Sequence, residues 1–188
     1  LLDPHRIDLA HWRDLLGKGV AMNTEQFANH VQADHLPHAV IVDCTANQAV
    51  ADRYAAWLTR GIHVITPNKR AHSGPMAYYQ DLKRFSRGSR THFLYEATVG
   101  AGLPVIQTLK DLVETGDEIR SISGIFSGTL AYLFNLFDGT RPFSEIVRDA
   151  KAKGYTEPDP RDDLSGKDVA RKAVILAREA GLSLELDD

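Results

Sequence analysis

The sequence predicts an α/β fold in which a doubly wound parallel sheet is followed by an α+β domain. Short apolar, β-branched runs at 39–44, 63–66 and 92–96 are typical of strands in a parallel sheet. Helical segments separate these runs and complete βαβ units with right-handed crossovers. After residue 104 the alternation ends and helices predominate, which indicates a second domain.

The first strand is flanked by two predicted helices. A short helix is expected at 24–34, with Thr24 as its cap, before the strand at 39–44. Residues 47–60 are expected to form an amphipathic helix, because apolar side chains recur at helical spacing: Val50, Tyr54, Trp57 and Leu58. Gly61 is expected to end that helix.

The next two strands, at 63–66 and 92–96, enclose a helix predicted at 75–87. In open parallel sheets, ligands bind just beyond the carboxyl ends of the strands. The sequence therefore places a ligand rim at Thr45, Lys69 and Glu96–Thr98.

The second half begins with a helix lined by Val105, Leu109 and Leu112 that ends near Gly116. Residues 119–126 alternate polar and apolar side chains, as a half-exposed strand does. Helices are expected at 128–138, 143–153 and 166–181. The last of these would bury one apolar face: Val169, Ala173, Leu176, Ala177 and Ala180.

We place a domain boundary near residues 97–104. Residues 1–98 are expected to form a partial Rossmann-like domain, and 99–188 the α+β domain. A complete nucleotide-binding sheet begins with a strand, a glycine-rich turn and a helix. No Gly-x-Gly-x-x-Gly is present, so that first βαβ unit is expected to be missing and the chain to be the central part of a longer protein.

Composition narrows the function classes. The net charge of −3 and the pI near 6.2 argue against a nucleic-acid surface, and no apolar run approaches the ~20 residues of a membrane span. The N-terminus does not resemble a signal peptide. A single cysteine, Cys44, cannot form an internal disulfide and favours the reducing cytoplasm. The eight histidines form no metal-binding motif and are interpreted as surface residues.

The segment 154–172 is the most informative in the chain, since it places five carboxylates and four cationic side chains around two prolines and a helix start. Ser165 is expected to cap the helix, with Asp168 completing a capping box. Asp168 and Lys172 then share one helical face. Such a site could hold a small zwitterion and move one proton.

These residues resemble homoserine dehydrogenase. The resemblance covers roughly residues 39–188 and rests on four motifs in order: Val42-Asp43-Cys44-Thr45, Thr66-Pro67-Asn68-Lys69, Glu96–Pro104 and Gly154–Lys172. Residues 123–130 also resemble the family's segment, and 40–60 look most like bifunctional aspartokinase–homoserine dehydrogenases. The resemblance implies that an aspartokinase region lies upstream.

The resemblance implies a function. The family interconverts L-homoserine and L-aspartate 4-semialdehyde with NAD or NADP, in threonine, methionine and isoleucine biosynthesis. Residues 1–98 would then be the partial dinucleotide-binding domain, and 99–188 the catalytic, substrate and dimerisation domain, incomplete at its C-terminus. The absent glycine-rich unit leaves cofactor binding by this chain alone, and the choice between NAD and NADP, open.

The resemblance also implies residue roles. Lys172 would relay the proton at the reacting hydroxyl, with Asp168 beside it and Lys69 between cofactor and substrate. Substrate contacts would come from Glu157 and Asp163 at the ammonium end, and from Asp168, Gly154, Tyr155 and Thr156. Cofactor contacts would come from Thr45, Ala46, Lys69 and Gly154. A monovalent-cation site, for sodium, would consist of the Glu96 carboxylate with the carbonyls of Val99, Ala101 and Leu103.

Each role has a purely structural alternative. Lys172 and Asp168 could form only a helical salt bridge, and Asp168 only a cap. Lys69 could be a surface residue, and Thr45 only a turn residue, although its hydroxyl and N–H could meet nicotinamide or ribose. The Glu96 carboxylate could bond only loop N–H groups.

Two other functions compete. One is a non-catalytic assembly or regulatory module. The other is a different Rossmann amino-acid or semialdehyde dehydrogenase, although Cys44, placed within a strand and buried, argues against the phosphorylating semialdehyde class. The alternating segment at 119–126 is expected to pair with a second subunit's sheet, which predicts a homodimer or larger homo-oligomer.

Overall fold

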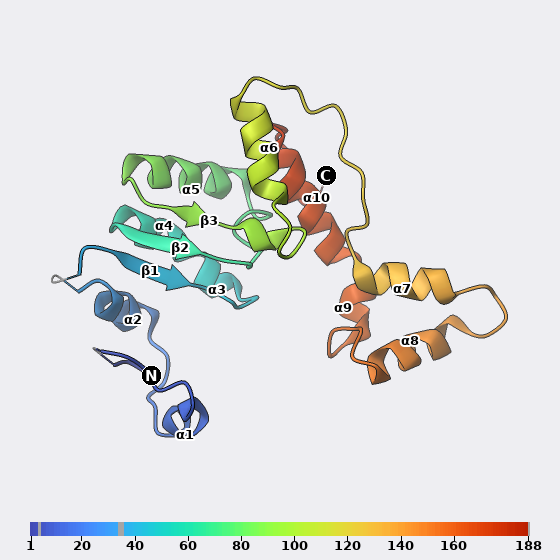
Figure 1. Ribbon diagram of the computed structural model, residues 1–188, viewed down its shortest axis with the longest axis horizontal. Helices are drawn as coiled ribbons and strands as arrows, with labels where there is room; N and C mark the ends of the chain where they lie inside the picture. The colour runs from blue at the N-terminus through green and yellow to red at the C-terminus, as the bar shows by residue number, and fades with distance from the viewer. Residues whose placement is uncertain (4, 34–35, 188) are drawn as a thin grey trace.

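The computed structural model describes residues 1–3, 5–33 and 36–187. Figure 1 shows one lobe that contains the sheet and a second lobe formed by α7, α8 and α9, with α10 running from one to the other. The main core lies in the first lobe. A small separate core of Leu133, Ile146 and Ala150 holds the second lobe together.

Two helices precede the sheet. α1 (Trp12–Gly17) buries no residue, whereas α2 (Thr24–Val31) packs on the first strand through Ala28. The prediction that Thr24 caps α2 is wrong. The cap is Asn23, whose side chain accepts the N–H groups of Glu25 and Gln26, each at 3.0 Å.

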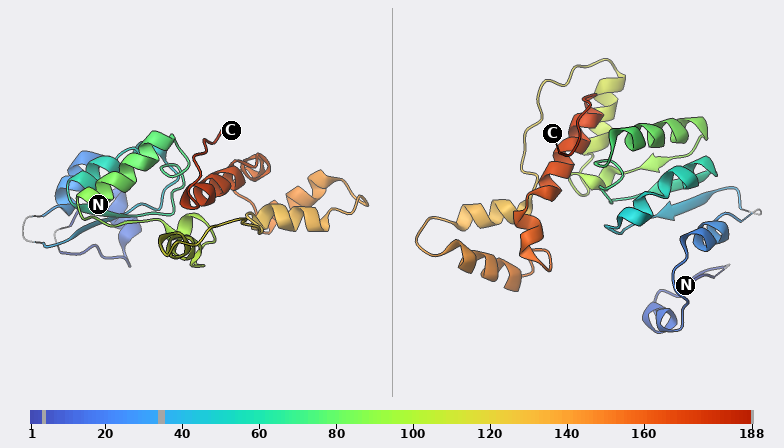
Figure 2. Two further views of the ribbon diagram at one scale, coloured as in Figure 1. Left: turned by 90° about the horizontal axis from the view of Figure 1, so that it is seen from above. Right: turned by 180° about the vertical axis from the view of Figure 1, so that it is seen from behind.

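The sheet has three parallel strands in the order β1 (Ala39–Val42), β2 (Ile62–Ile65) and β3 (Phe93–Leu94). This confirms the α/β, Rossmann-like fold class. Figure 2 shows helices packed against the sheet, and one row of strand side chains is buried: Ile41, Ile62, Val64 and Phe93. The strand residues exposed by 38–60% point to the other face, so the sheet is covered mainly on one face; they are Val40, Val42, Ile65 and Leu94.

The helix expected at 47–60 is divided into α3 (Gln48–Ala51) and α4 (Tyr54–Thr59) by a turn in which the Arg53 N–H bonds Val50. The two pieces still bury the expected face, because Tyr54, Trp57 and Leu58 belong to the main core. Gly61 follows α4 with φ +85°, as expected for a helix-ending glycine.

The third strand is shorter than expected. α5 (Met76–Gly88) leads to the short β3, and a 3₁₀ turn η1 (Glu96–Thr98) replaces the expected end of that strand. α6 (Val105–Glu114) follows and packs on both η1 and α10.

The remaining elements are helices: α7 (Gly128–Leu136), α8 (Phe143–Ala152), α9 (Pro160–Leu164) and α10 (Lys167–Glu179). The prediction of a strand at 119–126 is wrong for this structure. Within the described residues the segment crosses between lobes without a strand beside it to pair with. The α+β character expected for the second half is therefore not seen here.

α10 returns to the first lobe, where Ile175 and Leu176 join α6 in the main core. The prediction of which α10 residues form its apolar face is partly wrong, because Ala173 is exposed. The buried residues are Val174, Ile175, Leu176, Arg178 and Glu179. The C-terminal half of α10 is enclosed by α6 and the loop after β2, whereas its first turns line a cleft. None of the helices in the described residues is long and apolar enough to cross a membrane.

Candidate active site

A cleft of about 650 Å³ lies between the carboxyl ends of β1 and β2 and the start of α10. The sheet side contributes Cys44, Thr45, Ala46, Pro67, Asn68, Lys69 and Arg70. The helical side contributes Ser127, Glu157, Asp162, Asp163, Ser165, Lys167, Asp168, Val169, Arg171 and Lys172. The strand rim and segment 154–172, remote in sequence, therefore face each other across one cavity.

At the centre of this cleft, one carboxylate bridges two ammonium groups. Asp168 lies 3.1 Å from the Lys69 Nζ through one oxygen and 2.6 Å from the Lys172 Nζ through the other. The Lys69 and Lys172 side chains are 24% and 19% exposed, and that of Asp168 is 49% exposed. This three-residue group carries a net positive charge and is partly shielded from water.

The Lys172 ammonium is held by two acceptors. It donates to the carbonyl of Phe126 at 2.8 Å and to Asp168. An ammonium has three N–H donors, so one remains for a ligand in the cleft. The side chain as a whole is 19% exposed, which limits the directions that this third donor can take.

The ionisation of Asp168 follows from these neighbours. Burial acts to raise its pKa, but the hydrogen bond from Lys172 and the charge of Lys69 act more strongly together, and the net pKa lies below the ordinary 3.8. Asp168 is therefore a carboxylate at neutral pH and cannot serve there as a proton donor.

A buried hydrogen-bond network under the rim fixes the ends of β1 and β2. The Asp43 carboxylate accepts from the Tyr54 hydroxyl, from Asn68 Nδ2 at 3.0 Å and from the Thr45 N–H at 2.7 Å. Burial acts to raise the Asp43 pKa, but these bonds lower it overall. Sequence reasoning did not assign Asp43 or Tyr54 a role at the site, and their spacing of eleven residues gives no local signal.

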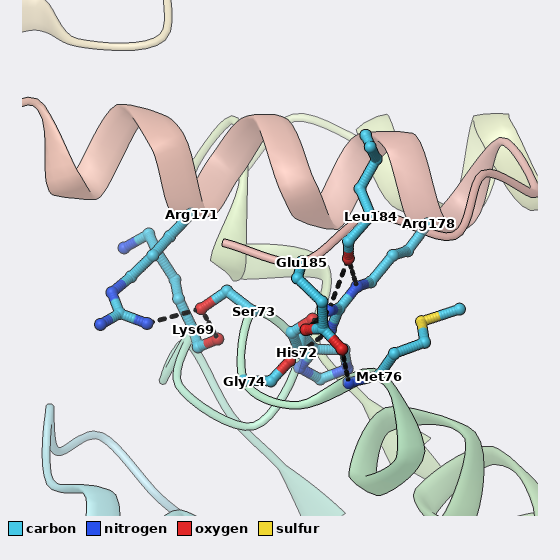
Figure 3. Close-up of polar contacts among 9 residues, drawn as sticks. All are labelled: Lys69, His72, Ser73, Gly74, Met76, Arg171, Arg178, Leu184 and Glu185. Atoms are coloured by element: carbon cyan, nitrogen blue, oxygen red, sulfur yellow. Dashed lines mark hydrogen bonds and ion pairs between the residues drawn. The ribbon is translucent and has the colours of Figure 1, made fainter. Parts of the chain in front are cut away.

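The loop that carries Lys69 is anchored to α10 (Figure 3). Ser73 Oγ donates to the Lys69 carbonyl at 2.9 Å and accepts from Arg171 at 2.7 Å. The buried Arg178 donates to the carbonyls of His72 at 2.6 Å and Gly74 at 2.8 Å. These bonds set the position of Lys69 relative to Lys172, and neither arginine was singled out from the sequence.

The sheet side of the cleft requires two corrections. The Thr45 N–H is bonded to Asp43 and Thr45 Oγ1 accepts from the Asn47 N–H at 3.2 Å, so the backbone N–H is not available to a cofactor as expected. Cys44 lies beyond the end of β1 and is exposed at the cleft, not buried within the strand. Burial of Cys44 therefore does not argue against a cysteine-dependent dehydrogenase. The Ala46 carbonyl accepts from Arg70 at 2.6 Å.

The acidic loop folds differently from the expectation. Residues 160–164 form α9, with Asp159 as its cap, and Ser165 ends α9 while Gly166 begins α10. The Ser165–Asp168 capping box is therefore wrong, because Asp168 points to the two lysines instead. Both Glu157 and Asp163 line the cleft, and Asp163 accepts the Glu157 N–H at 2.9 Å.

The other predicted residues lie outside the cleft lining. Gly154 ends α8 with φ +74°, the Tyr155 ring packs against Tyr132, and Thr156 Oγ1 donates to the Glu157 carbonyl. Their roles toward substrate and cofactor stay predictions.

The predicted cation site lies at the start of α6, also outside the cleft. The Glu96 oxygens accept the N–H groups of Ile106 at 2.8 Å and Gln107 at 2.9 Å. The Leu103 carbonyl accepts the Val105 N–H, and Ala101 has φ +52° in the loop between them. Glu96 therefore holds the helix start, as the structural alternative proposed, and a cation would share that carboxylate.

Comparison with known proteins identifies the family. Residues 7–96 match the family model described as homoserine dehydrogenase, NAD binding domain, and residues 104–188 match the model described as homoserine dehydrogenase. The chain belongs to the homoserine dehydrogenase family. The two matches leave residues 97–103 between them.

The relatives include single and fused enzymes. The chain is 59% identical to the bifunctional aspartokinase/homoserine dehydrogenase 2 of Arabidopsis thaliana, chloroplastic, over its full length and 21% of that protein. It is 47% identical to the homoserine dehydrogenase of Schizosaccharomyces pombe, with 97% of the chain and 50% of that protein covered. The chain thus spans about a fifth of the bifunctional relatives.

Solved structures share the fold. A Candida auris protein described as of unknown function is 42% identical with a TM-score of 0.80, over 89% of this chain and 48% of that one. The putative homoserine dehydrogenase of Archaeoglobus fulgidus is 27% identical with a TM-score of 0.74, over 94% and 53%.

Proposed function

We propose that the protein containing this chain catalyses NAD(P)-dependent interconversion of L-homoserine and L-aspartate 4-semialdehyde. The observation that carries this proposal is the Lys69–Asp168–Lys172 group in a cleft at the carboxyl ends of parallel strands. Membership of the homoserine dehydrogenase family supports the substrate pair. The cleft lining contains both carboxylates and ammonium groups, the partners that a small zwitterion requires, which supports the proposal independently.

The lysines supply what aldehyde reduction requires of the protein. The bound nicotinamide nucleotide supplies or accepts the hydride. As the aldehyde carbon is reduced, negative charge develops on its oxygen, and the third N–H of Lys172 donates a proton to that oxygen. Lys69 adds a second positive charge nearby, while Asp168 keeps both ammonium groups in place. In the oxidation direction the reverse step starts from the neutral Lys172 amine, which accepts the hydroxyl proton and becomes the ammonium.

The cleft also has groups for the two ends of the ligands. Glu157 and Asp163 are carboxylates on the wall opposite the sheet and suit the substrate ammonium group. Thr45, Ala46 and Lys69 form the strand rim, where nucleotides bind in folds of this type. The NAD-binding family match covers this rim, which supports NAD or NADP as the cofactor.

The assay that tests the proposal measures homoserine-dependent reduction of NAD or NADP by the protein with its flanking segments. Turnover of homoserine above other hydroxy and amino acids is expected. If no amino acid is turned over, the assembly or regulatory alternative gains support. If another amino acid or semialdehyde is strongly preferred, the chain serves a different dehydrogenase.

A substitution of Asp168 gives a pH-dependent prediction. Because the folded-state pKa lies below 3.8, the stabilisation from the ionised carboxylate is complete above the unfolded value and is lost as pH falls through the lower folded value. Asp168→Asn should lower kcat/KM at neutral pH and should lose less stability than the wild type on acidification below 3.8. Melting temperature against pH measures this, with Asp162→Asn as the control. An unchanged acid profile in Asp168→Asn would contradict the assignment.

We also propose a monovalent cation, sodium, at Glu96 and the carbonyls of Val99, Ala101 and Leu103. A carboxylate with loop carbonyls is an all-oxygen donor set, which suits a hard cation. Turnover is expected to rise with sodium or potassium, and this response is expected to be lost in Glu96→Gln but kept in Glu118→Gln, an exposed control. Equal turnover with and without these ions would contradict the proposed cation site.

The assembly proposals are a homodimer and a fused aspartokinase. The 119–126 segment supports the dimer, because it is extended and Ile125 is 80% exposed. Ile125→Asp should shift the sedimentation coefficient toward the monomer value; an unchanged value would exclude pairing through this segment.

Bifunctional relatives support the fusion, and we place the reaction in threonine and methionine biosynthesis. The single cysteine favours a reducing compartment such as the cytoplasm.

A further inference from the structure

A second cavity, of about 180 Å³, lies between α5 and α6 beside β3 and shares no lining residue with the cleft. We call it the basic pocket; its lining includes Lys83, Arg87, Lys110, Phe93, Tyr95 and Glu114. Pockets for drug-sized ligands occupy roughly 300–1,000 Å³. The basic pocket is smaller, so its size suits a small ion rather than a nucleotide.

The cations of the basic pocket are only partly neutralised. Lys83 is paired with Glu179 at 3.2 Å. The Lys110 ammonium lies 4.2 Å from the centre of the Tyr95 ring. Within the described part of the chain, neither Lys110 nor Arg87 forms an ion pair with a carboxylate. Two positive charges at one small cavity are therefore without a direct counter-charge.

The hydroxyl groups around the pocket are already committed. Tyr95 donates to Glu179 at 2.9 Å, and Ser86 donates to the carbonyl of Thr91 at 2.5 Å. The donors left for a ligand are thus those of the cationic side chains. A ligand that uses only such donors must present acceptors and negative charge, as an oxyanion does.

The acidic groups near the pocket set the net charge. Glu114 is the carboxylate in its lining and is exposed, and Glu179 lies behind Tyr95 and Lys83. The lining itself holds three cations and one carboxylate, so it carries an excess of positive charge, which Glu179 and Glu96 beyond the lining reduce. Burial, reinforced by the charge of Lys83, lowers the pKa of Lys110, although Glu179, Glu96 and Glu114 oppose that shift. A partly desolvated ammonium is stabilised when an anion binds beside it.

We propose that the basic pocket binds a small oxyanion, a phosphate or a carboxylate, through Lys110 and Arg87. Lys83 adds positive charge while it stays paired with Glu179. This site is separate from the dehydrogenase cleft, so its occupancy does not depend on the proposed reaction. Lys110 stands on α6, and α6 packs on α10, which carries Lys172. The basic pocket and the cleft are therefore connected through this pair of helices.

Calorimetric titration of the protein, with its flanking segments, tests the site at constant ionic strength in chloride. Inorganic phosphate and acetate are the two probes, and saturable binding of at least one is expected. Lys110→Met should weaken that binding about tenfold or more, and so should Arg87→Gln, since each removes a charge-assisted hydrogen bond. Lys151→Met, an exposed lysine on α8, is the matched control.

The two variants keep the test decisive. Arg87 is exposed, so its substitution leaves the packing intact even if Lys110→Met lowers stability. Tighter binding of phosphate than of acetate would identify a phosphate site, and the reverse order a carboxylate site. Equal affinity in the wild type and both pocket variants, or no saturable binding of either probe, would overturn the proposal.

Discussion

Lys172→Ala is expected to lower homoserine turnover about 10²–10⁴-fold, the range typical for loss of a general acid or base. The ammonium is fixed by Phe126 and Asp168 and has one N–H left for the reacting oxygen. In homoserine oxidation the neutral amine takes the hydroxyl proton, so its removal leaves the alkoxide charge that develops in the transition state without the group that accepts that proton. Because that charge arises only in the transition state, the loss should fall mainly on kcat. Steady-state kinetics with homoserine measure it.

The control for this prediction is Lys167→Ala. Lys167 also lines the cleft and stands on the same helix, but it makes no ion pair in the part of the chain that the structure describes. Its loss should change kcat far less. Circular dichroism should show that both variants remain folded. Wild-type turnover in a folded Lys172→Ala protein would remove the acid–base assignment.

Arg178→Met is expected to lower the free energy of unfolding by about 3–5 kcal/mol. The guanidinium is buried and donates to the carbonyls of His72, Gly74 and Leu184, and it also pairs with Glu185. Methionine fills part of the space but supplies no donor, and each carbonyl left unsatisfied costs roughly 1–3 kcal/mol. Urea denaturation at neutral pH measures the change.

Arg161→Met is the matched control for the stability prediction. Arg161 is fully exposed and pairs with the neighbouring Asp159, so its loss should affect unfolding far less than the loss of Arg178. Because the Arg178 contacts hold the loop that follows Lys69, Arg178→Met should also lose activity at temperatures where most of the protein is still folded. Equal unfolding free energies for the two variants would contradict the anchoring role of Arg178.

Local patterns predicted most of the first lobe. Apolar β-branched runs located all three strands, because parallel strands bury such residues against helices. Gly61 ended its helix as expected, since glycine readily adopts positive φ. The rim rule for open sheets brought Thr45 and Lys69 to the same cleft as the acidic segment.

The failures arise where distant residues decide the structure. Glu179 is buried because it accepts from Tyr79 and Tyr95, which are 100 and 84 residues away, and no helical periodicity reports such partners. The alternation at 119–126 satisfies the strand pattern, but a strand also needs a neighbour to pair with. Asp168 fitted a capping box by spacing, yet two lysines attract its carboxylate away from the backbone.

A structure of the protein with L-homoserine and oxidised nicotinamide nucleotide bound would show directly whether Lys172 faces the reacting hydroxyl. We expect the homoserine hydroxyl to lie within hydrogen-bond distance of the Lys172 Nζ, with the ammonium group facing Glu157 and Asp163. Homoserine bound outside the cleft, or with its hydroxyl turned away from Lys172, would contradict it.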